Sequence, residues 1–378
     1  MKFSSSQGEL NKALLLAGKS LLTKPNLPVL ANLLIKTGKG HIEILSTNLE
    51  TATRVTLPCE VAVEGETTLN GKTLLEFVSQ LPEGKVTLEK LGEEVLVSAS
   101  GFKARLATIA AEEFPAIPLI TKGTKLELSA ADFARLVGRV AFSAATDEGR
   151  PVLTGVLAEF SKGHLKMVAT DGYRLSFEQM DFEGGADVDM KLIVPARALI
   201  EVGKILSETE AEKFAIQVSE NLTQMNFNCA DVEFTSRLIE GEYPGWQRVI
   251  PGSFPTRVVV NKEELTKLVK VASIFARDAG SIVKVHVEPD AKAAGKGILK
   301  VEATASQVGS TDAQVEVTVT GPGGEIAFNY RYMLEALAVI GGEDVIFEMV
   351  ESLNPGKISP TDEKDKFFHI VMPVRLQS

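Results

Sequence analysis

One segment of the sequence has the residue types of a phosphate-binding loop, Gly65–Thr73 (GETTLNGKT). Such a loop works because its backbone N–H groups converge on phosphate oxygens, which requires four residues between its two glycines. Here five residues separate Gly65 from Gly71. The segment therefore predicts the start of a helix with a solvated Lys72, and nucleotide binding is not expected there.

No other group of residues has the spacing of a metal centre or a nucleophilic site. The four histidines lack an HxxxH spacing and lie singly in strand-like segments, at His41, His164, His286 and His369. Asp187 and Asp189 adjoin a Gly-Gly turn typical of a solvated loop, and Cys59 and Cys229 form no CxxC pair. We therefore expect no catalytic residue, no metal and no cofactor, and the two isolated thiols fit a reducing cytoplasm.

The chain contains three copies of one sequence pattern. Lys2–Gly18, Lys125–Ala141 and Arg257–Ser273 each read as a short strand, a polar cap and a helix. The apolar helix positions keep one i, i+3, i+4 register in all three, which predicts one buried face per helix. These positions are Leu10, Ala13 and Leu14, then Phe133, Leu136 and Val137, then Leu265, Leu268 and Val269.

Further landmarks follow in the same order. Pro28-Val29-Leu30 and Pro151-Val152-Leu153 lie 123 residues apart, the same offset as Leu10 and Phe133. A second helix is predicted in each repeat, at Asn70–Leu81, Pro195–Leu206 and Tyr330–Ile340. We predict three similar α+β domains of two helices and antiparallel sheet, with bounds 1–123, 124–253 and 254–378, called below the first, second and third repeats.

Charge is segregated between elements. The 378 residues carry a formal net charge of −10, and 44% are hydrophobic, which is typical of a globular protein and not of a general nucleic-acid binder. The six predicted helices nevertheless hold twelve basic and seven acidic residues over 6–22, 70–81, 130–145, 195–206, 261–277 and 330–340. They therefore carry +5 and the rest of the chain −15. A shared positive surface for a polyanion is the interpretation that this pattern favours. No signal peptide or membrane-length apolar run is seen, so we expect a cytoplasmic protein.

Several motifs in this three-repeat frame resemble the bacterial sliding clamp family, the beta subunits of DNA polymerase III. The resemblance covers the whole chain, and its most specific segments are the initial MKF, Lys24–Ile35 (KPNLPVLANLLI), Ala169–Ser176 (ATDGYRLS), Glu242–Pro251 (EYPGWQRVIP) and Val371–Leu376 (VMPVRL). It implies a DNA clamp fold, a non-catalytic homodimeric ring of six domains around duplex DNA, and tethering of polymerases, the clamp loader and repair proteins through short peptide motifs.

Helix dimensions support a dimer. Six helices about 10 Å wide, side by side, enclose a hole of only ~9 Å, whereas twelve leave ~28 Å. Duplex DNA, about 20 Å across, passes only the larger opening. One chain is therefore expected to form half a ring, with two-fold closure between the first repeat of one copy and the third repeat of the other.

Three sets of site residues follow. The positive bore is expected to comprise Lys24, Lys72, Arg135, Arg139, Arg197, Lys204, Lys267, Lys270 and Arg331. By resemblance, the dimer seam brings together Phe77, Leu81, Ile274 and Phe275. By resemblance, a partner-peptide groove between the second and third repeats comprises Arg150, Leu153, Thr170, Gly172, Tyr173, Arg174, Leu175, Pro244, Arg248, Val249, Tyr332, Leu353, Ile370, Val371, Met372, Pro373, Val374, Arg375 and Leu376.

The chain departs from the family at some positions, and other functions stay open. Asp147, Glu148 and Pro151 stand where some clamps place DNA contacts, so no DNA role is assigned to them. Gly280 falls near a position where some clamps have a bulky residue, so the pocket is expected to be shallower there. The alternatives are a nucleotide-dependent transferase using the Gly71–Thr73 region, another cytoplasmic repeat protein, or an adhesion module.

Overall fold

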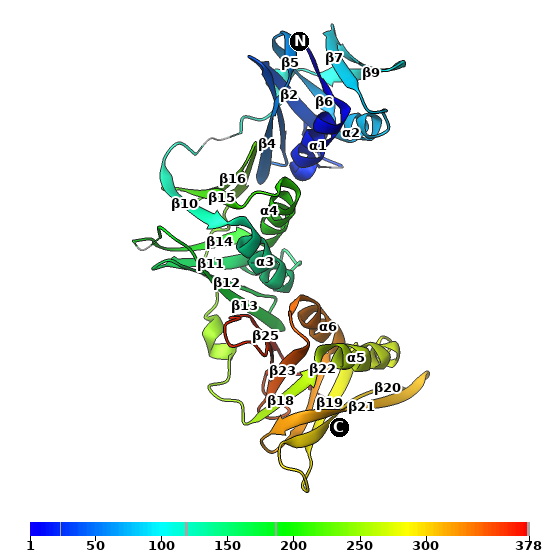
Figure 1. Ribbon diagram of the computed structural model, residues 1–378, viewed down its shortest axis with the longest axis vertical. Helices are drawn as coiled ribbons and strands as arrows, with labels where there is room; N and C mark the ends of the chain where they lie inside the picture. The colour runs from blue at the N-terminus through cyan, green and yellow to red at the C-terminus, as the bar shows by residue number, and fades with distance from the viewer. Residues whose placement is uncertain (23, 118–119, 186, 376–378) are drawn as a thin grey trace. The chain divides into compact units, whose positions relative to one another are not determined.

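The computed structural model describes residues 1–22, 24–117, 120–185 and 187–375. The chain divides into two compact units (Figure 1). Unit 1 comprises Met1–Ala134 with Arg197–Leu238, and unit 2 comprises Arg135–Ala196 with Ile239–Ser378. The second repeat is thus shared between the units, because one group of its strands joins the sheet of unit 1 and the other joins the sheet of unit 2.

Within the described part of unit 1, thirteen strands form one sheet. In order across the sheet they are β10 (Gly123–Ser129), β15 (Lys213–Ser219), β16 (Gln224–Cys229), β17 (Val232–Arg237), β4 (Thr51–Pro58), β3 (His41–Thr47), β2 (Asn32–Gly38), β6 (Gly65–Asn70), β9 (Phe102–Ile109), β8 (Glu94–Ala99), β7 (Lys85–Leu91), β1 (Lys2–Ser6) and β5 (Glu60–Val63).

The helices α1 (Gln7–Ala17) and α2 (Gly71–Ser79) pack side by side in unit 1 (Figure 1). The Asn70 side chain accepts a hydrogen bond from the N–H of Thr73 and caps α2. A Cβ on Gly71 would lie 2.3 Å from the side chain of Leu21, so this glycine permits close packing. The prediction that this segment starts a helix is therefore confirmed.

In unit 2, twelve strands of the described chain form the second sheet. Their order is β14 (Asp189–Pro195), β11 (Gly155–Ser161), β12 (His164–Thr170), β13 (Arg174–Asp181), β25 (Phe368–Val371), β24 (Gly356–Pro360), β23 (Asp344–Met349), β18 (Thr256–Asn261), β21 (Gly309–Thr320), β20 (Lys296–Ala305), β19 (Ile282–Pro289) and β22 (Gly324–Asn329). The remaining helices are α3 (Ala130–Val140), α4 (Ala196–Thr209), α5 (Lys262–Ala276) and α6 (Tyr330–Val339).

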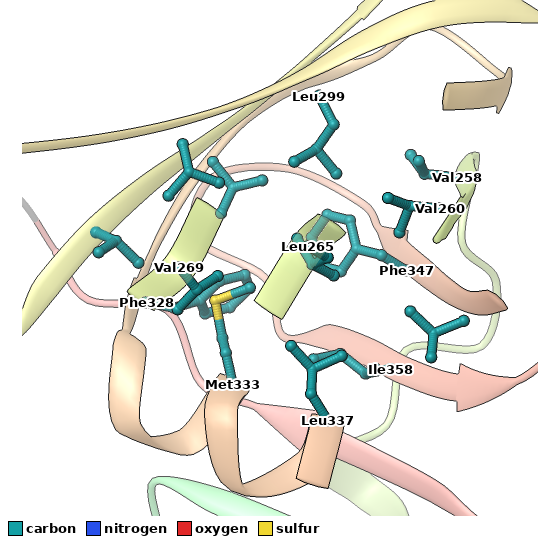
Figure 2. Packing of buried hydrophobic residues seen from close by; sticks show 14 of the residues in the cluster. Val258, Val260, Leu265, Val269, Leu299, Phe328, Met333, Leu337, Phe347 and Ile358 are labelled. Atoms are coloured by element: carbon teal, nitrogen blue, oxygen red, sulfur yellow. The ribbon is translucent and has the colours of Figure 1, made fainter. Parts of the chain in front are cut away.

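The predicted buried faces of the helices form the cores. Leu10 and Leu14 of α1 are fully buried, as are Phe133 of α3 and Leu265 of α5. Figure 2 shows Leu265 of α5 and Met333 of α6 packed with side chains from the strands of the third repeat. The described strands pair antiparallel, and helices pack against the sheets. The α+β prediction is therefore confirmed.

Strand pairing joins consecutive repeats in one recurring way. A hairpin strand of one repeat, β4, pairs antiparallel with the last strand of the next, β17, and β13 pairs likewise with β25. In both junctions the chain leaving the last strand donates one further hydrogen bond of 2.9 Å, from Arg237 N to Glu50 O and from Met372 N to Tyr173 O. Glu50 and Tyr173 are 123 residues apart, so the junctions occupy equivalent positions.

Candidate DNA, peptide and dimer interfaces

Eight of the nine cations expected to contact DNA are exposed. Unit 1 presents four of them and unit 2 the other four: Lys24, Lys72, Arg197 and Lys204, then Arg135, Lys267, Lys270 and Arg331. Apart from Lys24, they lie on helices. Lys72 and Lys204 have carboxylate neighbours one turn away, Glu76 at 3.8 Å and Glu201 at 2.7 Å. Such exposed pairs contribute little, so these cations stay available to a phosphate.

Sequence reasoning missed one cation of this kind. Lys12 is exposed on α1 and precedes Arg135 by 123 residues, so the two hold equivalent places in their repeats. The offset was the signal that could have identified Lys12.

Arg139 is the exception among the nine cations expected in the bore, because it is buried rather than exposed to solvent. It is only 8% exposed. Its Nη1 donates to Asp365 at 2.8 Å and to Glu178 at 3.3 Å, and its Nε donates to Val339 O at 3.1 Å. The reason is Glu178, which β13 directs toward α3 at 0% exposure, because a buried carboxylate requires cationic partners. Arg135, one turn earlier on α3, pairs with the same carboxylate but keeps an exposed side chain.

Glu178 ends a row of three polar residues on the helix-facing side of β13. Arg174 donates to Phe142 O at 2.7 Å and pairs with Asp171 and with Glu335 of α6. Ser176 bonds both Ser143 and His369 at 2.7 Å. Each member of the row is at most 9% exposed. The guanidinium of Arg174 is thus occupied within the protein, and it fixes β13 to the elements beside it.

The residues on the other side of β13 are apolar, and Leu175 among them belongs to the set expected to form the peptide groove. Leu175 and Ile370 pack in one buried cluster with Leu157, Val168 and Ile193. Tyr243 also packs against this cluster, and its hydroxyl accepts a hydrogen bond from Thr170 N at 3.2 Å, while burial raises the pKa of Tyr243. The tyrosine therefore holds the turn that follows β12.

Several expected groove residues lie on the surface around this cluster. Tyr173 is 62% exposed, Val249 is 41% exposed and Leu353 is 61% exposed. Arg150, Gly172, Pro244, Arg248 and Arg375 are also exposed, whereas Thr170, Tyr332, Met372, Pro373 and Val374 are half-buried and Leu153 is 8% exposed.

Four of the expected groove residues lie against one another in two pairs, Arg150 with Gly172 and Arg174 with Tyr332. Arg150 donates to Asp171 O at 3.0 Å, and its Nη1 would lie 3.1 Å from a Cβ on Gly172, so this glycine gives the arginine room. The ring of Tyr332 lies under the Arg174 guanidinium at 4.7 Å.

The expected groove residues of the C-terminal segment are held by the third repeat. Ile370 and Val371 are buried strand residues of β25, which ends at Val371 as expected before a proline. The tail beyond it is also held, since Val374 N donates to Ala327 O at 2.8 Å. Leu376 lies outside the described residues.

The residues expected at the dimer seam differ in their exposure. Ile274 of α5 is 53% exposed, whereas Phe275 is half-buried against the core of the third repeat. Phe77 is half-buried and Leu81 only 6% exposed. Phe102, which sequence reasoning missed, is 52% exposed at the start of β9, and a large exposed aromatic side chain marks a candidate contact.

Family models for the DNA polymerase III beta subunit match in three consecutive pieces: the N-terminal domain over residues 1–118, the central domain over 127–245 and the C-terminal domain over 247–375. The chain belongs to the DNA polymerase III beta subunit family. A beta sliding clamp of Synechococcus elongatus is 28% identical over the full length of both chains. Beta subunits of known structure from Thermotoga maritima (28% identity, TM-score 0.92) and Pseudomonas aeruginosa (26%, 0.90) cover 100% of this chain and are themselves covered completely.

Membership confirms the three-domain clamp fold and the non-enzymatic role. A bacterial sliding clamp is a processivity factor of the polymerase holoenzyme and performs no catalysis itself, so the transferase alternative is not favoured. Within the ranges that the structure describes, no helix is long and apolar enough to cross a membrane.

A Ser–His pair in this clamp has the residue types of a nucleophilic site. His369 Nδ1 lies 2.7 Å from Ser176 Oγ, but both residues are 0% exposed, so no substrate can reach them. The imidazole stacks on Phe142 at 5.6 Å. Burial, with a contribution from the Arg174 charge, lowers the pKa of His369 to about 3. The pair is therefore a neutral link between β13 and β25.

This lowered pKa predicts a pH dependence of stability. The unfolded chain takes up a proton at His369 below pH 6.5, whereas the folded clamp does so only near pH 3, so folding stability falls as the pH drops through that window. Replacing His369 by Asn keeps a bond to Ser176 and removes the titration. Between pH 7 and pH 5 the unfolding free energy should fall by about 2 kcal/mol more in wild type than in H369N. Urea unfolding at both pH values measures it, and equal losses would contradict the buried neutral imidazole.

Proposed function

We propose that two copies of this chain close into a ring that encircles duplex DNA and holds polymerases through a peptide groove. The repeated junction supports closure most directly. β4 pairs with β17, and β13 pairs with β25. By the same pattern, the hairpin strand of the third repeat, β21, would pair with β9, the last strand of the first repeat, in another copy. In the described chain, no strand pairs with the outer edge of β9 over Phe102–Ala107 or of β21 over Gly309–Val317. A second copy supplies both partners.

Charge and apolar surface on the two open edges are complementary. β9 exposes Lys103 and Arg105, and β21 exposes Asp312 and Glu316. The exposed Phe102 on β9 and Ile274 on α5 supply apolar area beside these charges. Opposite charges across paired strands favour the correct partner and disfavour pairing of β9 with a second β9. Phe77, Leu81 and Phe275 complete the proposed seam.

The helix cations supply sequence-independent attraction to DNA in this proposal. Eight of the expected nine are exposed, while the chain as a whole carries −10. Contacts between such side chains and phosphates fix no sequence register, which suits a clamp that slides. Arg139 is withdrawn from the proposed contact set because it is only 8% exposed and its donors are engaged in unit 2.

The apolar cluster beside β13 supports a site for a partner's short motif, one glutamine with one or two large apolar residues. Leu153, Leu175, Val249 and Met372 would form its floor, and a thioether adapts to differently shaped anchors. Polar rim groups, Arg150 among them, would orient the glutamine amide. Polymerase subunits, the clamp loader and repair proteins are the proposed partners. We also infer a cytoplasmic location and the domain bounds 1–123, 124–253 and 254–378.

Charge reversal on α5 tests the bore. Lys267→Glu with Lys270→Glu should shorten retention of the loaded ring on closed circular DNA, and the salt slope of DNA affinity should fall by about 1.8 per chain for two lost phosphate contacts. The control is Lys284→Glu with Lys296→Glu, which changes the same charge on exposed strand positions of the same unit. Equal retention of both variants would contradict the bore.

A single acidic substitution tests the seam. Ile274→Asp places a carboxylate in an apolar contact, at a cost of several kcal/mol, and should give folded monomers of 40.6 kDa in sedimentation at micromolar concentration. Leu91→Asp, at a residue 44% exposed on β7, is the control and should remain dimeric. A full dimer mass for I274D and for Phe102→Asp would place the contact elsewhere.

Truncation of the floor tests the groove. Leu153→Ala with Met372→Ala should weaken binding of a polymerase C-terminal peptide at least tenfold, about 1.4 kcal/mol, in calorimetric titration. Ring assembly should persist, because neither residue lies on β9, α5 or β21. Leu222→Ala, at a residue 48% exposed, is the control. Unchanged affinity would refute the groove even if the ring is correct.

A further inference from the structure

The two junctions between repeats share their antiparallel strand pairing and differ in the side chains between helix and strand, at one helix–strand pair in particular. In unit 1, Leu16 of α1 and Val55 of β4 are both apolar and at most 4% exposed. The residues 123 positions later are Arg139 of α3 and Glu178 of β13, an ion pair at 3.3 Å. Unit 2 thus has a buried charge pair where unit 1 has an apolar pair.

Arg139 does more than neutralise Glu178. It also holds Asp365 at 2.8 Å, in the segment that leads into β25, and the carbonyl of Val339 at 3.1 Å at the end of α6. Its guanidinium lies over the ring of Phe367 at 5.4 Å. One side chain of the second repeat therefore contacts two segments of the third.

These contacts lie beside the strands that carry the proposed groove. Glu178 is four residues from Arg174 on β13, and Asp365 is five residues before Ile370 on β25. Asp365 also accepts a hydrogen bond from Phe367 N at 3.1 Å. The bond from Arg139 to Asp365 therefore helps to fix the backbone position at which β25 begins. A directional ion pair fixes one geometry, whereas an apolar pair tolerates sliding.

We propose that Arg139, Glu178 and Asp365 are positioning residues that set β25 against β13 and so pre-form the peptide groove. The proposal rests on the groove described under the proposed function. None of these three residues is proposed to contact the peptide itself. A groove ordered before binding avoids the cost of ordering it during binding, so loss of the ion pair should weaken affinity even where the fold survives.

The internal repeat supplies the test variant. Arg139→Leu with Glu178→Val installs the residue types found at Leu16 and Val55. Each single substitution removes one partner from a buried charge, because Arg139→Leu leaves Glu178 with Arg135 alone and Glu178→Val leaves Arg139 with Asp365. Each should therefore lower the melting temperature, whereas the double variant should recover most of that loss. The matched control is Lys191→Leu with Glu159→Val, which replaces an ion pair of 2.7 Å between β14 and β11 of the same unit.

Peptide affinity is the deciding measurement. A short synthetic peptide with a glutamine followed by a leucine and a phenylalanine is titrated into wild type and each variant. The double variant should bind about fivefold or more weakly despite its recovered melting temperature, with the control like wild type. Wild-type affinity in the double variant, or an equal loss in the control, overturns the positioning role. No binding to wild type refutes the groove itself, and the positioning role falls with it.

A second variant covers the case in which the double variant fails to fold. Asp365→Asn keeps the oxygen that accepts from Phe367 N and removes the charge facing Arg139. It should keep the melting temperature within a few degrees and still weaken the peptide several-fold. Unchanged affinity in D365N overturns the proposal.

Discussion

Backbone pairing between a hairpin strand of one repeat and the last strand of the next is the constraint on which the rest of the structure depends. A strand edge without a partner leaves N–H and C=O groups exposed and open to association with another chain. β17 and β25 have both edges paired because β4 and β13 cover them. The outer edges of β9 over Phe102–Ala107 and of β21 over Gly309–Val317 have no such partner in the described chain, which leaves them open to a second copy.

This pairing also explains why one strand serves two purposes. Side chains alternate across a strand, so β13 presents Arg174, Ser176 and Glu178 to one side and Leu175 and Phe177 to the other. The first set binds α3, the turn that follows it, α6 and His369 of β25. The second set joins the apolar cluster beside the proposed groove. A displacement of β13 caused by a substitution on its polar side therefore also moves the apolar side chains beside the proposed groove.

The repeat offset predicted much of this arrangement from sequence alone. The 123-residue spacing placed both Pro-Val-Leu segments, which are 3-10 turns at Pro28–Ala31 and Pro151–Thr154, and the first helices with their buried faces. It could not place Arg139, because i, i+4 spacing from Arg135 describes a helix without its neighbours. The buried carboxylate that attracts Arg139 comes from a strand 39 residues away.

Long-range pairing escaped prediction for the same reason. Nothing local to Val374 indicates that its N–H bonds to Ala327, 47 residues earlier. Phe102 is likewise an ordinary strand residue until the edge of β9 is known to be open. In both cases, sequence patterns give an element's type and buried face, whereas its partner is set by tertiary contacts that no local window contains.

The two junctions show what the backbone constraint leaves free. Because main-chain hydrogen bonds set the strand positions in both, the side chains between helix and strand can diverge without changing the fold. Leu16 and Val55 contribute roughly 1.5 to 3 kcal/mol each by burial, without preferred direction. Arg139 and Glu178 contribute less net stability for their size, since desolvation offsets their attraction, yet they specify distance and angle. The directional pair lies at the junction beside the proposed groove, where a fixed position of β25 against β13 would keep the groove formed before a peptide binds.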